Sequence, residues 1–159
     1  MRNEDAIQLL LDIEAIKKLK AFYCYLVDAG AKGDASKIDA LVELLADDIV
    51  GDYGPLGTYV GKESFRNLFA QMAPSTMPFS AHMVHNPVIN VAGDTATGWW
   101  YYEIPCSLKT LNTAAWAQGK YEDEYVRVGD SWKFKSIKVI MNYFTTFDKG
   151  WVKEQFVQF

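Results

Sequence analysis

The second half of the chain restricts its fold most, because it consists almost entirely of long strand-like segments. Four runs rich in β-branched and aromatic residues make up this half, at residues 79–91, 95–111, 114–128 and 132–147. Short turns separate these runs, and the first and third turns place glycine beside aspartate, which is typical of hairpins. The pattern predicts a four-stranded antiparallel meander.

The first half is mainly helical. Residues 4–30 predict a long helix, because apolar side chains recur at helical spacing while Lys17, Lys18 and Lys20 fall mostly on other faces. Shorter helices are predicted at 36–45 and 61–72, with short strands at 47–53 and 58–60 between them. The tail from residue 150 is predicted to be a short helix or an extended arm.

This order of elements predicts an α+β fold in a single domain that covers residues 1–159. A strongly curved, mixed but mainly antiparallel sheet wrapped around the N-terminal helices satisfies the order. Such a cone leaves an internal pocket between the sheet and the helices. Because 14% of the residues are aromatic, the chain has more aromatic side chains than a small core needs, and we expect some to line that pocket or an interface.

Charge and composition exclude several classes of partner and cofactor. The formal net charge of −4 provides no clustered basic surface for a nucleic acid. The first apolar stretch is interrupted by acidic residues and lysines, so it predicts neither a signal peptide nor a membrane span, and we expect a cytoplasmic protein. Cys24 and Cys106 are far apart and predict buried thiols rather than a disulfide or a metal site. The sequence contains no cofactor-binding motif, and we expect neither a cofactor nor a metal.

Polar residues within apolar segments are the candidates for chemistry. Asp28 ends an apolar helical stretch, where the helix dipole disfavours a carboxylate. His82 and His85 are three residues apart on a predicted strand, so only one of them can face the pocket. A histidine oriented by a carboxylate is a general base. Each of these residues also has a purely structural explanation: Asp28 as a solvated or loop-bonding residue, and the histidines as side chains bonded to backbone.

Aromatic residues complete the candidate site. Tyr23 precedes Asp28 by five residues and is a candidate donor of a hydrogen bond to a substrate oxygen. Six further side chains are candidates for packing the substrate: Tyr53, Trp100, Tyr102, Trp116, Met141 and Tyr143. Most of the aromatic residues of the chain are explained simply as core or interface residues.

On these residues the chain resembles the SnoaL-like branch of the nuclear-transport-factor-like (cystatin-like) cone fold. The resemblance covers nearly the whole chain and rests on residues 12–20 with Tyr23 and Asp28, on residues 82–87 and 95–98, and on residues 124–125, 132–134 and 141–145. The first two groups are similar to bile-acid dehydratases and the last to hexachlorocyclohexane dehydrochlorinases. Both are lyases without a cofactor that remove a proton and a leaving group from an apolar ring.

The resemblance implies that Asp28 and His82 form a catalytic pair with His82 as the base. Both enzyme groups also place an arginine in the pocket, where this chain has Ile137 or Met141, and Ile104 replaces an aspartate of the bile-acid enzymes. The dehydrochlorinases carry lysine at the position of Tyr23. These departures favour loss of water, or proton transfer within a ring, over loss of halide.

Two functions of different class therefore remain open. The first is a dehydratase-like lyase or an isomerase that acts on a hydrophobic cyclic small molecule. The second is a non-catalytic module of the same fold that binds a small molecule or mediates assembly. In either case we expect a homo-oligomer, with a trimer favoured by the resemblance and a dimer as the alternative, because the outer sheet face is rich in apolar residues.

Overall fold

A computed structural model describes residues 2–30 and 32–158 of the chain. Helix α1 (Asn3–Gly30) agrees with the predicted helix at 4–30 and buries a stripe that includes Ile16, Leu19 and Tyr23. The stripe also contains Lys20, which is fully buried, so the prediction that this lysine lies on an outer face is wrong. Lys20 is four residues after Ile16 and three before Tyr23, which places all three side chains on one helix face.

The second helix and the two short strands after it lie close to their predicted positions. Helix α2 (Ala35–Val42) begins after Asp34, whose side chain accepts a hydrogen bond from the backbone N–H of Ser36. It ends three residues before the predicted position 45, because Leu45 already belongs to strand β1 (Leu45–Asp52). A short 3₁₀ turn, η1 (Gly54–Leu56), leads into strand β2 (Thr58–Val60).

Helix α3 (Gly61–Thr76) runs four residues beyond its predicted end at residue 72. The run predicted as one strand at 79–91 is divided into strands β3 (Phe79–Ser80) and β4 (Met83–Ala92). Residues 81–82 interrupt the strand pattern, although the backbone N–H of Ala81 still donates to the carbonyl of Pro105 in β5. The backbone N–H of His82 then donates to the side chain of Asp28.

Three long strands form the predicted meander: β5 (Thr95–Leu108), β6 (Thr113–Val128) and β7 (Ser131–Thr146). Helix α4 (Gly150–Lys153) follows, and the tail then returns so that Phe156 pairs with Phe144 of β7. The tail therefore combines the two predicted forms, a short helix and an arm. No helix in the described part of the chain has the length and apolar character needed to cross a membrane.

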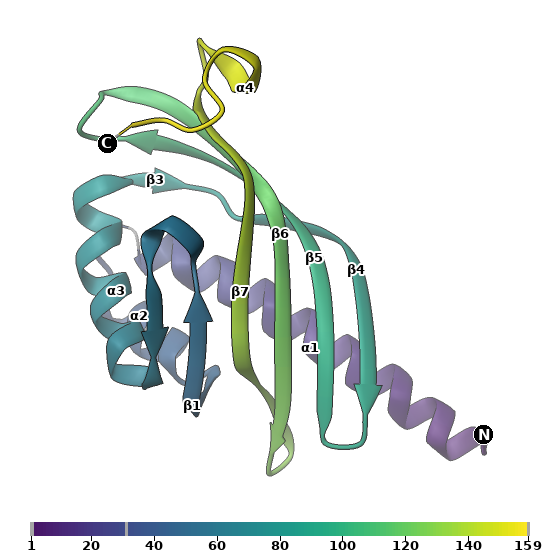
Figure 1. Cartoon of the computed structure of the whole chain (residues 1–159). Helices are drawn as coiled ribbons and strands as arrows, with labels where there is room; N and C mark the ends of the chain where they lie inside the picture. Colours follow the sequence, from purple (N-terminus) through teal and green to yellow (C-terminus); the bar gives the residue numbers. More distant parts are fainter. Residues whose placement is uncertain (1, 31, 159) are drawn as a thin grey trace.

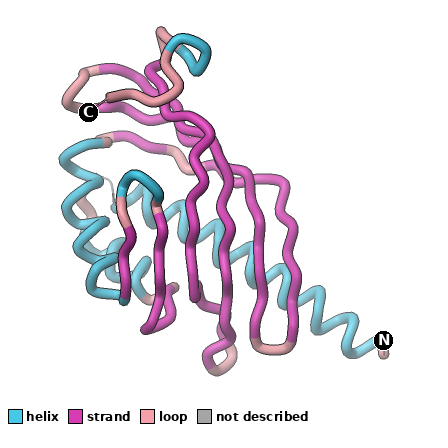
Figure 2. Tube along the Cα trace, in the orientation of Figure 1, coloured by secondary structure: helices cyan, strands magenta, loops and turns pink. Residues whose placement is uncertain are grey.

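The seven strands form one sheet in the order β2-β1-β7-β6-β5-β3, with β4 also paired to β5. Among the strands of the described residues, only β1 and β7 pair in parallel, so the sheet is mixed and mainly antiparallel, as predicted. Figure 1 shows that the sheet curls and that α1 runs across its inner side, and Figure 2 shows the same arrangement in a plain trace. The α+β cone is thus confirmed.

One glycine contributes to the curvature of the sheet. Gly119 lies where the pairing of β6 with β7 shifts register, and a Cβ at this position would collide with the backbone oxygen of Ile140. The ring of Tyr102, the cross-strand partner of Gly119, occupies the space above it. A bulge with a glycine bends a strand, and here it opens room on the inner face.

Candidate active site

Asp28 and His82 lie together, although 53 residues separate them along the chain. The Nδ1 atom of His82 is 2.6 Å from Oδ1 of Asp28. The backbone N–H of His82 donates to Oδ2 of Asp28 at 2.9 Å, and the hydroxyl of Ser80 donates to Oδ1 at 2.8 Å. The carboxylate near the end of α1 is therefore held by three donors, one from the last residue of β3 and two from His82 between β3 and β4.

This geometry determines which nitrogen of His82 is free. A carboxylate only accepts hydrogen bonds, so Nδ1 carries the hydrogen and Nε2 of the neutral ring keeps its lone pair. Burial raises the pKa of Asp28, but the hydrogen bonds and charge of His82, together with Ser80, outweigh burial and hold that pKa below its ordinary value. Asp28 is therefore ionised at neutral pH and can balance the charge of an imidazolium.

A cavity of about 100 Å³ lies between α1, α3 and the concave face of the sheet, and His82 is part of its wall. Most of its lining is apolar, including Val27, Phe69 and Val139. Its polar atoms come from a small set of side chains: Tyr23, Tyr53, Ser80, His82, Tyr102 and Tyr121. Among the described residues, no aspartate, glutamate, lysine or arginine lines it. The cavity thus suits an uncharged, mainly apolar molecule.

The hydroxyls of Tyr23 and Tyr53 lie 2.8 Å apart and share one hydrogen bond. Burial raises the pKa of both phenols well above the ordinary value, so both keep their hydrogens at neutral pH. Since one hydroxyl donates to the other, one hydrogen of the pair remains to be donated elsewhere. This pair can therefore supply a hydrogen bond to an oxygen of a bound molecule.

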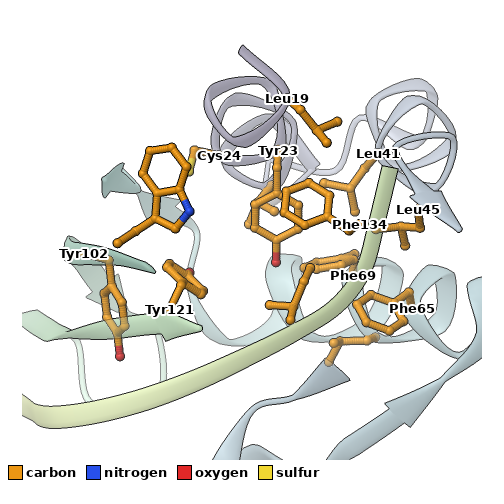
Figure 3. Packing of buried hydrophobic residues seen from close by; sticks show 14 of the residues in the cluster. Leu19, Tyr23, Cys24, Leu41, Leu45, Phe65, Phe69, Tyr102, Tyr121 and Phe134 are labelled. Carbon is orange, nitrogen blue, oxygen red and sulfur yellow. The ribbon is translucent and has the colours of Figure 1, made fainter. Parts of the chain in front are cut away.

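Tyr102 supplies a second polar contact. Its side chain is 1% exposed, and its hydroxyl has no hydrogen-bond partner within residues 2–30 and 32–158. A buried hydroxyl without a partner costs free energy, which a ligand atom in the cavity would recover. Figure 3 shows Tyr102 and Tyr121 side by side below α1, and Tyr23 pointing from α1 toward the sheet.

The predicted packing residues divide into two groups. Tyr53, Tyr102 and Met141 line the cavity. Trp100, Trp116 and Tyr143 do not, and this corrects their predicted place.

The three residues outside the cavity have definite positions elsewhere. Trp100 is on the inner face of β5, but its Nε1 donates to the hydroxyl of Tyr125 at 3.0 Å, away from the cavity. Trp116 and Tyr143 both pack against Trp151 of α4. Trp116 alternates with the buried Ala117, which does line the cavity, so its side chain points to the opposite face. The alternation of side chains along a strand did not predict how far along the strand a residue meets the cavity. Across a bulge, it also did not predict on which face of the sheet the side chain lies.

His85 lies outside the cavity, as expected for the second histidine. Its ring stacks on Tyr101 at 6.0 Å between centroids, and its Nε2 is 3.9 Å from Glu103. The described residues contain no group of three or more histidine, cysteine or acidic side chains placed to hold a metal ion. Both cysteines are buried, and burial raises the pKa of each thiol to about 11.

Sequence reasoning missed a buried ion pair next to this site. Nζ of Lys20 is 2.8 Å from Oδ2 of Asp123, and both side chains are fully buried. The spacing of Ile16, Lys20 and Tyr23 already placed the lysine on the inner face of the helix. Asp123 likewise alternates with the buried Tyr121 and Tyr125 on β6. These two periodicities were the signal that could have revealed the pair.

Most of the chain matches one protein family. A family model for the SnoaL-like domain matches residues 8–138. The chain belongs to the SnoaL-like family. The match confirms the resemblance seen in the sequence, and it covers most of α1, most of the cavity lining and most of the sheet.

Solved structures agree with this membership. A type 2 hexachlorocyclohexane dehydrochlorinase (LinA) superimposes with a TM-score of 0.80 and 25% identity, over 89% of this SnoaL-like chain and 92% of that chain. A type 3 LinA from Novosphingobium barchaimii gives 0.78 and 25%, over 89% and 93% of the two chains. A candidate scytalone dehydratase from Novosphingobium aromaticivorans gives 0.79 at 19% identity, over 89% and 91%, and supports the fold alone.

Proposed function

We propose that this SnoaL-like protein is a lyase or isomerase that needs no cofactor and acts on a hydrophobic cyclic small molecule. The observation that carries the proposal is the 2.6 Å contact between Asp28 and His82 at the wall of an apolar cavity. Structural relatives named as hexachlorocyclohexane dehydrochlorinases support the reaction class, because such enzymes remove a proton and a leaving group.

His82 acts as the base in this proposal. Its Nε2 takes a proton from a ring carbon, and Asp28 stabilises the imidazolium that forms. The electron pair of the broken C–H bond moves onto a conjugated oxygen, which accepts a hydrogen bond from the Tyr23–Tyr53 pair. Because burial raises the pKa of both phenols, these tyrosines donate a hydrogen bond and keep their protons.

The imidazolium then returns its proton, and the destination of the proton decides the product. If the proton goes to another carbon, the substrate is isomerised. If it goes to a hydroxyl on the adjacent carbon, the C–O bond breaks, a C=C bond forms and water leaves. Both routes restore neutral His82, so neither requires a further reactant.

The cavity limits the substrate to small, uncharged rings. An engineered apolar cavity of about 150 Å³ accepts benzene, and the cavity here has about 100 Å³. Because this volume is smaller than that of the benzene-binding cavity, a single ring enters only when lining side chains such as Met141 move. The absence of a charged side chain among the described lining residues argues against carboxylate or phosphate substrates, because burying an unpaired anion is costly.

Hydrogen–deuterium exchange tests the proposal without knowledge of the leaving group. Cyclic ketones, enones and β-hydroxyketones are incubated with the protein in D₂O, and deuterium on carbon is measured by mass spectrometry. We expect exchange with the wild-type protein and its loss in His82→Gln. His85→Gln is the matched control, because His85 lies outside the cavity, and it should keep the activity. Exchange that persists in His82→Gln would show that His82 is not the base.

The second candidate function is a non-catalytic binding module, and the absence of a cation in the described cavity lining favours it. Ligands that raise the melting temperature of the wild-type protein, without any exchange or turnover, would support this alternative.

Self-association also belongs to the proposal. The outer face of β4 and β5 exposes large apolar side chains, including Val88 at 50% and Trp99 at 53%. Exposed patches of this kind mark contact surfaces. We therefore propose a homo-oligomer that covers this face, with a trimer as the favoured form.

A further inference from the structure

The buried pair of Lys20 and Asp123 has no part in the chemistry described above. Asp123 is held from one side by the hydroxyl of Tyr125, which donates to Oδ2 at 2.9 Å, and Trp100 in turn donates to Tyr125 at 3.0 Å. The other oxygen of Asp123, Oδ1, has no hydrogen-bond partner in the described part of the chain. The carboxylate is thus bound on the side of Tyr125 and Trp100, and neither of these residues lines the cavity.

The side chain of Lys20 packs against aromatic rings. Its Nζ lies 3.4 Å from the ring centroid of Tyr121 and 5.1 Å from that of Tyr23. Both rings belong to the wall of the cavity. The ammonium group therefore packs directly against two rings of the cavity wall.

Stability alone does not explain this pair. Removing two charges from water is costly, and buried pairs can often be replaced by apolar residues without loss of stability. Here the compensation is incomplete, since Oδ1 of Asp123 lacks a partner in residues 2–30 and 32–158. A buried charge also acts over a longer distance than a charge in water, because the surrounding dielectric is low.

We infer that Lys20 is a positioning residue that stabilises negative charge on an oxygen bound in the cavity, acting through the rings of Tyr121 and Tyr23. The inference rests on the proposed function, in which a substrate oxygen gains charge. A cation over a ring face withdraws electron density from the phenol and makes its hydroxyl a stronger donor. Asp123 keeps the ammonium in place and weakens its field.

A phenolate probe tests this inference directly. The probe is 4-nitrophenol, a single ring whose absorption distinguishes the bound phenol from the bound phenolate. The measured quantity is the ratio of bound phenolate to bound phenol in the wild-type protein and in each variant. The variant Lys20→Met should lower this ratio about tenfold, since it removes a nearby charge in a low dielectric. The variant Asp123→Asn should raise the ratio, since it removes the opposing charge.

The opposite signs separate the inference from a structural role, which would weaken binding in both variants. The double variant Lys20→Met/Asp123→Leu removes the whole pair and serves if a single variant does not fold, and it should also lower the ratio. Lys18→Met is the matched control, because Lys18 is exposed on the same helix, and it should behave as wild type. An unchanged ratio in Lys20→Met or a lower one in Asp123→Asn would each overturn the inference.

The two proposals fail in different ways. His82→Gln should abolish deuterium exchange, and Lys20→Met should still lower the ratio of bound phenolate to bound phenol when it is added to His82→Gln, because Lys20 does not contact His82 in the arrangement described. A protein in which Lys20→Met lowers this ratio but which never exchanges hydrogen would contradict the proposed reaction and leave the role of Lys20 standing.

Discussion

Replacing Asp28 with asparagine is expected to lower the free energy of unfolding by about 1–2 kcal/mol at neutral pH. The carboxylate accepts three hydrogen bonds, from the hydroxyl of Ser80 and from two nitrogens of His82. A hydrogen bond to a charged group contributes about 1.5–3 kcal/mol. The asparagine keeps part of this set through its single oxygen, and the Asp28 side chain is 21% exposed, so the expected loss is well below the sum.

The loss should depend on pH in a defined direction. The pKa of Asp28 is held below its ordinary value of 3.8, so the carboxylate stabilises the folded state above that pH. The stabilisation is lost as the pH falls through the lowered pKa of the folded state. The difference between wild type and Asp28→Asn should therefore be largest near neutrality and shrink in acid.

Urea unfolding followed by tryptophan fluorescence, from neutral pH to about pH 3, measures this difference. Asp148→Asn is the control, because Asp148 is an exposed turn residue, and it should unfold like wild type. The side-chain amide of the variant also faces Nδ1 of His82, so NMR should show the ring hydrogen moved to Nε2. A difference that stays constant in acid, or an unchanged tautomer, would refute the reasoning.

Three further predictions concern stability, ligand binding and assembly. Tyr102→Phe removes a buried hydroxyl without a described partner, so the ligand-free variant should be about 1 kcal/mol more stable to urea. The same variant should bind 4-nitrophenol more weakly. A lower stability would instead show that the hydroxyl is hydrogen-bonded. Gly119→Ala should destabilise the protein by about 2 kcal/mol or more, because its Cβ collides with backbone, and an unchanged unfolding midpoint would contradict the described bulge. Sedimentation at micromolar concentration should show a homo-oligomer that dissociates in Trp99→Glu, and a monomeric wild type would reject the proposed assembly.

Local patterns in the sequence were sufficient for the architecture. The alternation and turn residues of the second half predict the meander, since strand periodicity and hairpin turns depend on neighbours a few residues away. The helical spacing from Ile7 onward, with the glycines that follow, predicts α1 to its last residue and to within one residue at its start. Asp28 and His82 were predictable as unusual polar residues in apolar segments, and family resemblance supplied the reason to pair them.

Tertiary structure decided which of these residues share a space. The sequence indicates that Trp100 and Tyr102 lie on one face of a strand, but only the curvature of the sheet places Tyr102 at the cavity and Trp100 against Tyr125. The hydrogen bond between His82 and Asp28 requires the interruption between β3 and β4, where the backbone N–H of His82 also donates to Asp28, and no local propensity specifies it. Lys20 is buried because Asp123, about a hundred positions away, arrives beside it. Long-range pairing decides such contacts, since burial of a charge depends on its partner and not on its own neighbours in sequence.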